Sequence, residues 1–580
     1  MRFGGSPVLA ADLNGDPNDK RKFISSYFVL DITNPENEPV LLGEMTQKVD
    51  ANGNDVFTNM QYTTSSPAMI IMRDGGADAV TSKWYLTLGS GPAELTGINN
   101  SGQHGKLAIL PLDWLNGEID SNSWQKGIPT SVDASTKKAF RIPDARPTSS
   151  SSEGGRFIVP AAEGASFLSD IISVDYNIEL ASEDDLGARY RTDAVYFGTV
   201  DGSDFEKYPA NYLDGNADQF YWKGGGRLFR LVTKMLGDSE DANNNGVLDE
   251  GEDINNNGKL DLLAEEASVP ADWKTKWDDE QPLRLLADLK MPVVAGPSIG
   301  YDGDNYWVYA GTGRLYSEKD KTDDGWCIDT SDATCASRSR AALFGLKEPL
   351  MNDLSSDFSK WSAVDRPPST ANFTCTDNVM TWETIDWDIT DSTKDNQDLE
   401  DIAAAAPSGT RGLMRTDNIL VELETGYLYC LTGNDADCFP DFDASDQGPL
   451  WDGSQYTFDN LQQYIAGTGC DANEVHTGRD GWYHVFHDAR ERNLGTSALL
   501  GGLLTFTTYQ PYNDRCEVEG ESYLYGIHFQ TGTAWTQSVF GTFDHTVSGE
   551  NKTIVQNKMS LGRGLSTTPS MHVGSDADSA

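Results

Sequence analysis

Short apolar runs separated by Gly, Asp, Asn and Pro turns dominate the chain, and they recur in a fixed order. A run opened by Pro comes first, an aromatic run closed by Gly second, and an alternating apolar run third. The first kind occupies 66–71, 296–299 and 568–571, the second 84–89, 195–198 and 307–311, and the third 106–110, 227–231 and 342–346. Runs of this length between turn signals predict an all-β protein. Only residues 398–406 could form a helix of two turns.

The repeated order predicts a β-propeller, because a blade consists of consecutive strands that pack on the next blade. Less regular copies at 27–45, 413–432 and 495–535 bring the total to about six units, with a further half unit at the C-terminus. A β-sandwich would not need so many similar units. The uneven spacing indicates long loop insertions, at 120–165, 203–225, 236–282, 318–340, 350–405 and 433–480.

One insertion contains a calcium-loop motif. Residues 241–252 read DANNNGVLDEGE and match the twelve-residue EF-hand loop at its demanding positions. A glycine at position 246 permits the sharp turn, and calcium prefers six to eight oxygen ligands. The expected ligands are Asp241, Asn243, Asn245, the carbonyl of Val247, Asp249 and Glu252.

A second, shorter copy follows directly. Its ligands would be Asp253, Asn255, Asn257, the carbonyl of Lys259 and Asp261. Its twelfth position is Ala264, so this loop is incomplete unless Glu265 contributes. We therefore predict a loop pair at 238–265 that binds Ca²⁺ with a Kd on the order of 10⁻⁴ M or somewhat tighter. The alternative is an Asn-rich double turn that binds nothing.

Charge and cysteine content limit the function classes. The 580 residues carry 44 basic and 90 acidic side chains, a net charge of −46, which argues against nucleic acid and anionic membrane surfaces as partners. No apolar run is long enough to span a bilayer. Cys327–Cys335 and Cys430–Cys438 each enclose a short polar loop, which favours disulfides in an oxidising, extracytoplasmic compartment over buried free thiols.

No catalytic motif is present, so we expect no enzyme and assign no catalytic residue. His484 and His487 lie in GWYHVFHD, where strand alternation would place them on opposite faces, against a shared ligand role. The acidic groups at 12–16, 302–304 and 435–446 are typical of solvated turns. Met1 starts no signal peptide, so the protein is either cytosolic or a fragment of a longer one, and the cysteine pairs favour the fragment.

The stretch 481–532 contains a series of short motifs: Gly481-Trp482-Tyr483, Glu491-Arg492, Phe506-Thr507-Thr508, Pro511, Cys516, Leu524-Tyr525-Gly526 and Thr531-Gly532. In these motifs it resembles the C-terminal region of PilY-type type IV pilus biogenesis factors, the tip-associated adhesins. Arg490 replaces the glycine that precedes Glu-Arg in the family. Further similar segments are 27–35, 192–202 leading to 226–231, and 308–316.

The resemblance implies a modified, seven-bladed propeller that acts at the cell surface or pilus tip. It implies minor pilin components as partners and attachment to a host or abiotic surface. The family's calcium loop usually precedes the strand matching 194–198, whereas the motif here follows 228–231. Two alternatives stay open. One is a quinoprotein-like dehydrogenase propeller that uses pyrroloquinoline quinone, because residues 529–535 resemble the blade endings of that family. The other is a surface scaffold whose calcium is purely structural.

Overall fold

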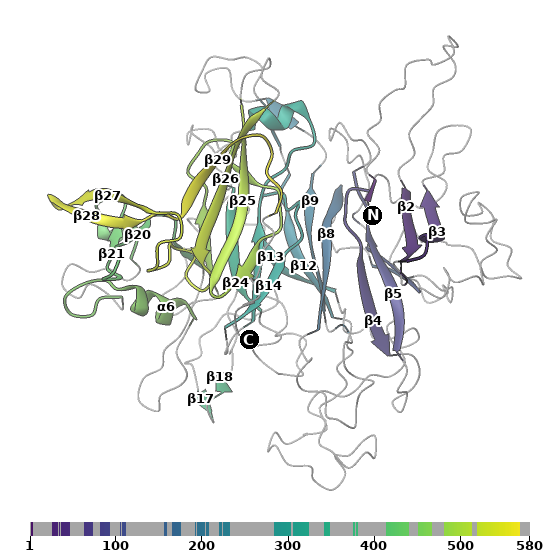
Figure 1. The fold of residues 1–580 in the computed structure, drawn as a ribbon, viewed down its shortest axis with the longest axis horizontal. Helices are drawn as coiled ribbons and strands as arrows, with labels where there is room; N and C mark the ends of the chain where they lie inside the picture. The colour runs from purple at the N-terminus through teal and green to yellow at the C-terminus, as the bar shows by residue number, and fades with distance from the viewer. Residues whose placement is uncertain are drawn as a thin grey trace, which may run out of the picture. The chain divides into compact units, whose positions relative to one another are not determined.

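The computed structural model separates into two compact units, each formed by several segments of the chain (Figure 1). Unit 1 comprises Met1–Phe205, Trp222–Asp288 and Leu354–Phe358, and unit 2 comprises Glu206–Tyr221, Leu289–Asp353 and Ser359–Ala580. The residues that the structure describes are 2–3, 26–32, 34, 36–46, 63–73, 82–92, 105, 107–111, 156–158, 165–175, 192, 194–202, 205–207, 220–222, 224–232, 283–289, 291–302, 306–323, 341–348, 375–376, 379–380, 413–439, 450–466, 481–512 and 519–568.

Unit 1 contains three antiparallel sheets. The first has the order β1-β2-β3, the second β4-β5-β6-β7 and the third β8-β9-β12-β13. Their bounds are β1 Arg2–Phe3, β2 Ser26–Asp31, β3 Val40–Thr46, β4 Ala68–Arg73, β5 Ser82–Gly89, β6 Leu107–Pro111, β7 Arg156–Ile158, β8 Ser166–Val174, β9 Ala194–Asp201, β12 Arg227–Val232 and β13 Leu283–Asp288. The short pair β10 (Phe205–Lys207) and β11 (Phe220–Trp222) lies between β9 and β12 in sequence.

Unit 2 contains two larger sheets, ordered β14-β15-β16-β22-β19 and β23-β25-β26-β29, with β24 paired to β25. Their bounds are β14 Ser298–Tyr301, β15 Tyr306–Gly311, β16 Ala342–Lys347, β19 Leu413–Arg415, β22 Gly481–Val485, β23 Arg492–Asn493, β24 Ala498–Leu500, β25 Leu503–Pro511, β26 Gly520–His528 and β29 Lys558–Arg563. Three two-stranded ladders complete it: β17 Cys375–Thr376 with β18 Val379–Met380, β20 Ile419–Val421 with β21 Leu428–Cys430, and β27 Thr542–Val547 with β28 Glu550–Val555.

The repeated order of runs in the sequence corresponds to the order of neighbouring strands in these sheets. The three kinds of run become β4, β5 and β6 in one sheet and β14, β15 and β16 in another, each paired antiparallel to the next. In the third copy β9 and β12 match the second and third runs, and β8 takes the first place. The all-β fold class is therefore confirmed, and the three runs form open antiparallel meanders of the kind found in propeller blades. One sheet departs from this pattern, because β19 pairs parallel to β22. The blade count of seven stays a prediction.

The core of unit 2 includes residues from a segment that the sequence presents as an insertion. Between 433 and 480, Phe439, Leu450, Tyr456 and several residues of a helix are buried. This helix, α6 (Phe458–Ala466), was not predicted, and the stretch 398–406 lies outside the described residues. Its buried positions 458, 461 and 465 follow helical spacing, and the Thr457 hydroxyl caps its start by accepting the Asn460 N–H at 3.3 Å. Two 3₁₀ turns, η2 (Glu318–Thr322) and η4 (Asp435–Asp437), are also present.

Candidate functional site

The predicted calcium ligands lie outside the described residues. This holds for the whole loop pair at 238–265, including every ligand between Asp241 and Asp261. Within the part of the chain that the structure describes, no three His, Cys, Asp or Glu side chains are grouped as a metal ion would require. The calcium site therefore stays a prediction from the sequence.

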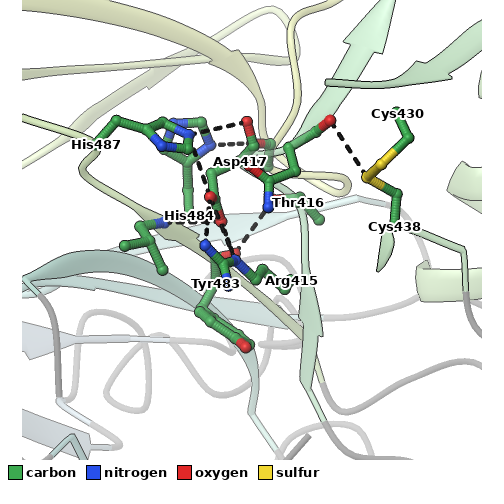
Figure 2. A network of polar contacts seen from close by, with 11 residues as sticks. Arg415, Thr416, Asp417, Cys430, Cys438, Tyr483, His484 and His487 are labelled. Atoms are coloured by element: carbon green, nitrogen blue, oxygen red, sulfur yellow. Dashed lines mark hydrogen bonds and ion pairs between the residues drawn. A yellow bond between two sulfur atoms is a disulfide. The ribbon is translucent and has the colours of Figure 1, made fainter. Parts of the chain in front are cut away.

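The described polar site of unit 2 centres on Asp417, directly after strand β19 (Figure 2). Its side chain is fully buried, and one carboxylate oxygen lies 3.0 Å from Nε of Arg415. The Val485 N–H donates to this same oxygen at 3.3 Å, and the other oxygen lies 3.2 Å from Nε2 of His487. Burial raises the pKa of Asp417, but the hydrogen bond and charge of Arg415 and the nearby histidines outweigh burial, so the pKa is lowered. Asp417 is thus held as a buried carboxylate.

The argument from strand alternation does not reach both histidines. Strand β22 ends at Val485, so alternation does not extend to His487, which pairs with Asp417, while His484 acts on that carboxylate through its charge (Figure 2). His484 is buried, and its Nδ1 lies 2.9 Å from the carbonyl oxygen of Gly532. Burial lowers its pKa to about 4, although the charge of Asp417 acts in the opposite direction. His487 is half exposed.

One predicted disulfide is confirmed beside this site. Cys430, at the end of β21, is bonded to Cys438, with 5.6 Å between their Cα atoms (Figure 2). Sulfur of Cys438 also lies 3.4 Å from the carbonyl oxygen of Asn418. Cys327 and Cys335 lie outside the described residues. The bond ties the hairpin β20–β21 to the turn η4 that follows it.

Two of the motifs that carry the family resemblance, Gly-Trp-Tyr and Thr-Gly, meet at Trp482. Its indole N–H donates to the carbonyl of Phe529 at 2.9 Å, and the ring is fully buried. Glycines leave the room for this ring: a Cβ at Gly345 would lie 2.3 Å from it, and so would a Cβ at Gly532. Gly532 also has φ +66°, a conformation that favours glycine. The Gly-Trp-Tyr and Thr-Gly motifs are therefore two halves of one packing arrangement.

The Glu-Arg pair has a different structural role for each residue. The Glu491 side chain is fully buried and accepts hydrogen bonds from the hydroxyls of Thr508, at 2.5 Å, and Tyr525, at 2.8 Å. Both donors belong to motifs that carry the resemblance. Their bonds explain why a carboxylate is tolerated there.

Arg492 links this region to the segment 308–316, which also resembles the family. Its guanidinium donates to the carbonyls of Arg314, at 2.7 Å, and Asp320, at 2.8 Å. It also donates to the carbonyl of Asp323 at 2.9 Å, so it binds the end of the 3₁₀ turn η2. Arg314 in turn forms a buried ion pair with Asp320 at 2.6 Å. A cavity of about 20 Å³ borders this cluster, which is room for a single water.

The departure at Arg490 has a backbone explanation. Its φ is +65°, in the left-handed region where a glycine is unstrained. The family's glycine at this place fits the same conformation. Arg490 is held there by a hydrogen bond of 3.3 Å from its Nε to the Pro511 carbonyl.

The acidic groups are solvated or satisfied where the structure describes them. Asp302 accepts hydrogen bonds from the Trp307 indole and the Gln530 amide, both at 2.8 Å. Asp437 accepts from Thr432 and Asn434 at 2.8 Å, at an exposed turn. Residues 12–16 lie outside the described residues. Asp437 behaves as the turn acceptor that the sequence indicated, whereas Asp302 joins Trp307 to Gln530, which is 228 positions from Asp302 in sequence. Residues 303–305 and 440–449 lie outside the described residues.

Sequence reasoning did not single out Asp417, Asp488 or Lys558. Asp417 bonds to Val485, 68 positions away, and Lys558 bonds to Asp488, 70 positions away, so no short motif connects them. The geometry around Asp417 orients and stabilises charge, while the absence of enzyme activity remains an expectation from the sequence. No helix of the described residues combines the length and apolar character needed to cross a bilayer.

Comparisons with known proteins include a weak structural likeness. No protein-family model matches the chain, and no curated protein gives a significant match. Among solved structures, the C-terminal domain of PilY1 from Pseudomonas aeruginosa aligns with 92% of this chain and 73% of its own, at 14% identity and a TM-score of 0.37. A likeness of this size carries no argument about function.

Proposed function

We propose that this chain is the β-propeller region of a cell-surface, type IV pilus-associated adhesin and biogenesis factor that binds calcium through residues 241–252. The pilus components would be its partners, and loops between blades would present the adhesive surface. Its place would be extracellular, at the cell surface or pilus tip. The proposal concerns binding and assembly, with no catalytic step.

One observation supports the proposal above the others: the residues that carry the family resemblance contact one another in unit 2. Arg492 of the Glu-Arg pair binds the carbonyl of Arg314, 178 positions away in sequence. Glu491 binds Thr508 and Tyr525, and Trp482 packs on Gly532. Gly-Trp-Tyr therefore meets Thr-Gly, and Glu-Arg meets Phe-Thr-Thr and Leu-Tyr-Gly, while Cys516 lies outside the described residues. The likeness therefore concerns the residues that build the domain.

Calcium would act on the insertion that contains the loop pair. Three of the expected ligands of the first loop are carboxylates, Asp241, Asp249 and Glu252. Without a cation these like charges repel one another, and Ca²⁺ would offset that repulsion while fixing the loop. An ordered loop at the surface could then contribute to attachment or to pilus assembly.

The calcium part is tested by limited proteolysis of the full chain with millimolar Ca²⁺ or with chelator. We expect calcium to slow cleavage within 238–262, and the double variant Asp241→Ala with Glu252→Ala to lose that protection. The matched control, Asp544→Ala with Glu550→Ala, removes two carboxylates from the exposed hairpin β27–β28. This control should retain the protection by calcium. Calorimetry showing no heat at millimolar Ca²⁺ with folded protein would reject calcium binding.

The pilus part is tested by deleting the gene and counting surface pili and attached cells. We expect fewer pili, restored by the wild-type gene and not restored fully by the Asp241→Ala, Glu252→Ala variant. Normal piliation and attachment in the deletion strain would contradict the proposal. Reduction of a dye by purified protein given pyrroloquinoline quinone and an alcohol would favour the dehydrogenase alternative instead.

A further inference from the structure

Lys558, the first residue of edge strand β29, contacts two carboxylates at once. Its Nζ lies 2.5 Å from Oδ2 of Asp488 and 2.9 Å from Oε2 of Glu491. The Lys558 side chain is 25% exposed, that of Asp488 48%, and that of Glu491 is fully buried. One amine therefore meets a carboxylate open to solvent and a second one shielded from it.

A single turn presents both carboxylates. The Glu491 N–H donates to the carbonyl of Asp488 at 3.1 Å, which closes the turn. Arg490, within it, has the left-handed φ of +65° and bonds to the Pro511 carbonyl. The amide of Gln510 donates to the carbonyl of Ala489 at 2.9 Å, so the turn is fixed to strand β25. Asp488 and Glu491 are thus held in place before Lys558 reaches them.

The surroundings of Nζ leave it little freedom. The ring centroid of Tyr523 lies 4.0 Å from Nζ, and that of Tyr525 lies 5.4 Å away. Oε1 of Glu491 is occupied by the hydroxyls of Thr508 and Tyr525, which directs Oε2 toward the amine. The Lys558 amine thus contacts the carboxyl group of Asp488, beside the buried carboxylate of Glu491 and two aromatic rings. This arrangement favours amide formation through proximity and proton transfer.

We propose that Lys558 and Asp488 join through an amide bond, with Glu491 moving the proton. Glu491 Oε2 takes a proton from the Lys558 ammonium, and the neutral amine attacks Cγ of Asp488. The C–N bond forms and a C–O bond of the carboxyl group breaks. The leaving oxygen departs as water, which takes the proton held by Glu491 and a second proton lost by the attacking nitrogen. An ammonium and a carboxylate give one amide and one water, so no oxidant or further reactant is needed. The exposed side of Asp488 gives the water a way out.

The bond would connect two segments 70 positions apart in sequence. One is the turn before β23, and the other is the start of β29, which pairs with β26 at the edge of its sheet. Hydrogen bonds alone hold an edge strand on one side only. The amide would attach β29 covalently, so that it could not peel away from the sheet. This inference does not depend on the proposed pilus function.

The test is the mass of the full-length wild-type chain after reduction of its disulfides, followed by peptide mapping. We expect a mass lower than that of the sequence by one water, about 18 Da, and a cross-linked peptide pair containing Lys558 and Asp488. Wild-type protein of full mass, with the circular dichroism of folded β-sheet, would overturn the proposal. A water loss that maps to any other pair of residues would overturn it as well.

Three variants separate the roles. Lys558→Arg keeps the positive charge and removes the reactive amine, and it should restore the full sequence mass. Asp488→Asn offers an amide carbon and should lose ammonia, about 17 Da, in place of water. Glu491→Gln should slow bond formation by at least about 100-fold, since a positioned acid–base group typically contributes that much. A cross-link that forms at the wild-type rate in Glu491→Gln would refute the proton-transfer role.

Discussion

Acid should weaken strand β22 through the buried His484. Its folded-state pKa is about 4 because the imidazole is buried, against the ordinary value of 6.5. The unfolded chain therefore binds the proton more tightly than the folded one. The stability that depends on neutral His484 is complete above pH 6.5 and is lost as the pH falls toward 4.

The magnitude follows from these two values. The full difference corresponds to about 3 kcal/mol, and a fall from pH 7 to pH 5 removes about 2 kcal/mol of it. His528 is also buried, against Phe458 and Trp535, and burial lowers its pKa to about 4. It should contribute a loss of similar size over the same interval. These two sites make unit 2 sensitive to mild acid.

The assay is native-state hydrogen exchange of the peptide that covers β22, Gly481–Val485, corrected for the intrinsic pH dependence of exchange. In His484→Asn, the side-chain amide can still donate to the Gly532 carbonyl, and the titrating group is gone. From pH 7 to pH 5, we expect the opening free energy of the wild type to fall by about 2 kcal/mol or more. The opening free energy of His484→Asn should fall over the same interval by an amount about 2 kcal/mol smaller.

The comparison uses pH dependence, so a constant loss of stability in the variant does not affect it. His545→Asn, on the exposed strand β27, is the matched control and should retain the wild-type dependence. Equal pH dependence in His484→Asn and the wild type would refute the reasoning, because another group would then have to carry the acid sensitivity.

Three further substitutions test the packing and the polar site. Because Arg490 has a left-handed backbone, the variant Arg490→Gly should be about 1 kcal/mol more stable than Arg490→Ala, the reverse of the usual order. Equal denaturation midpoints for the two variants would contradict this. Gly532→Ala should destabilise unit 2 by about 2 kcal/mol or more, because its Cβ meets the ring of Trp482 and its φ is positive; a thermal melt unchanged from the wild type would show that the ring moves freely. Asp417→Ala should cost about 2–3 kcal/mol by leaving Arg415 without its carboxylate, measured by urea unfolding, and a wild-type midpoint would mean that solvent replaces the pair.

The repeated strand pattern was predictable because neighbouring runs in the sequence are neighbouring strands in the sheets. Alternation and turn residues act locally, so the residues of each short run are enough to place β4, β5 and β6. Helix α6 was not predicted because only three buried apolar positions show the helical spacing, within a segment otherwise rich in turn residues. The Cys430–Cys438 bond was readable for the same local reason, a separation of eight residues.

By itself, the amino-acid sequence determined the all-β class, the order of three consecutive strands in two of the sheets, the resemblance to pilus factors and the calcium-loop motif. Each of these depends on residues close together in the chain, where spacing and composition decide the outcome. The tertiary structure alone decided that His487 pairs with Asp417, that Arg492 binds the turn after Arg314, and that Lys558 meets Asp488 and Glu491. Those contacts join distant segments, and only the way β-strands pack brings their side chains within a few ångströms of one another.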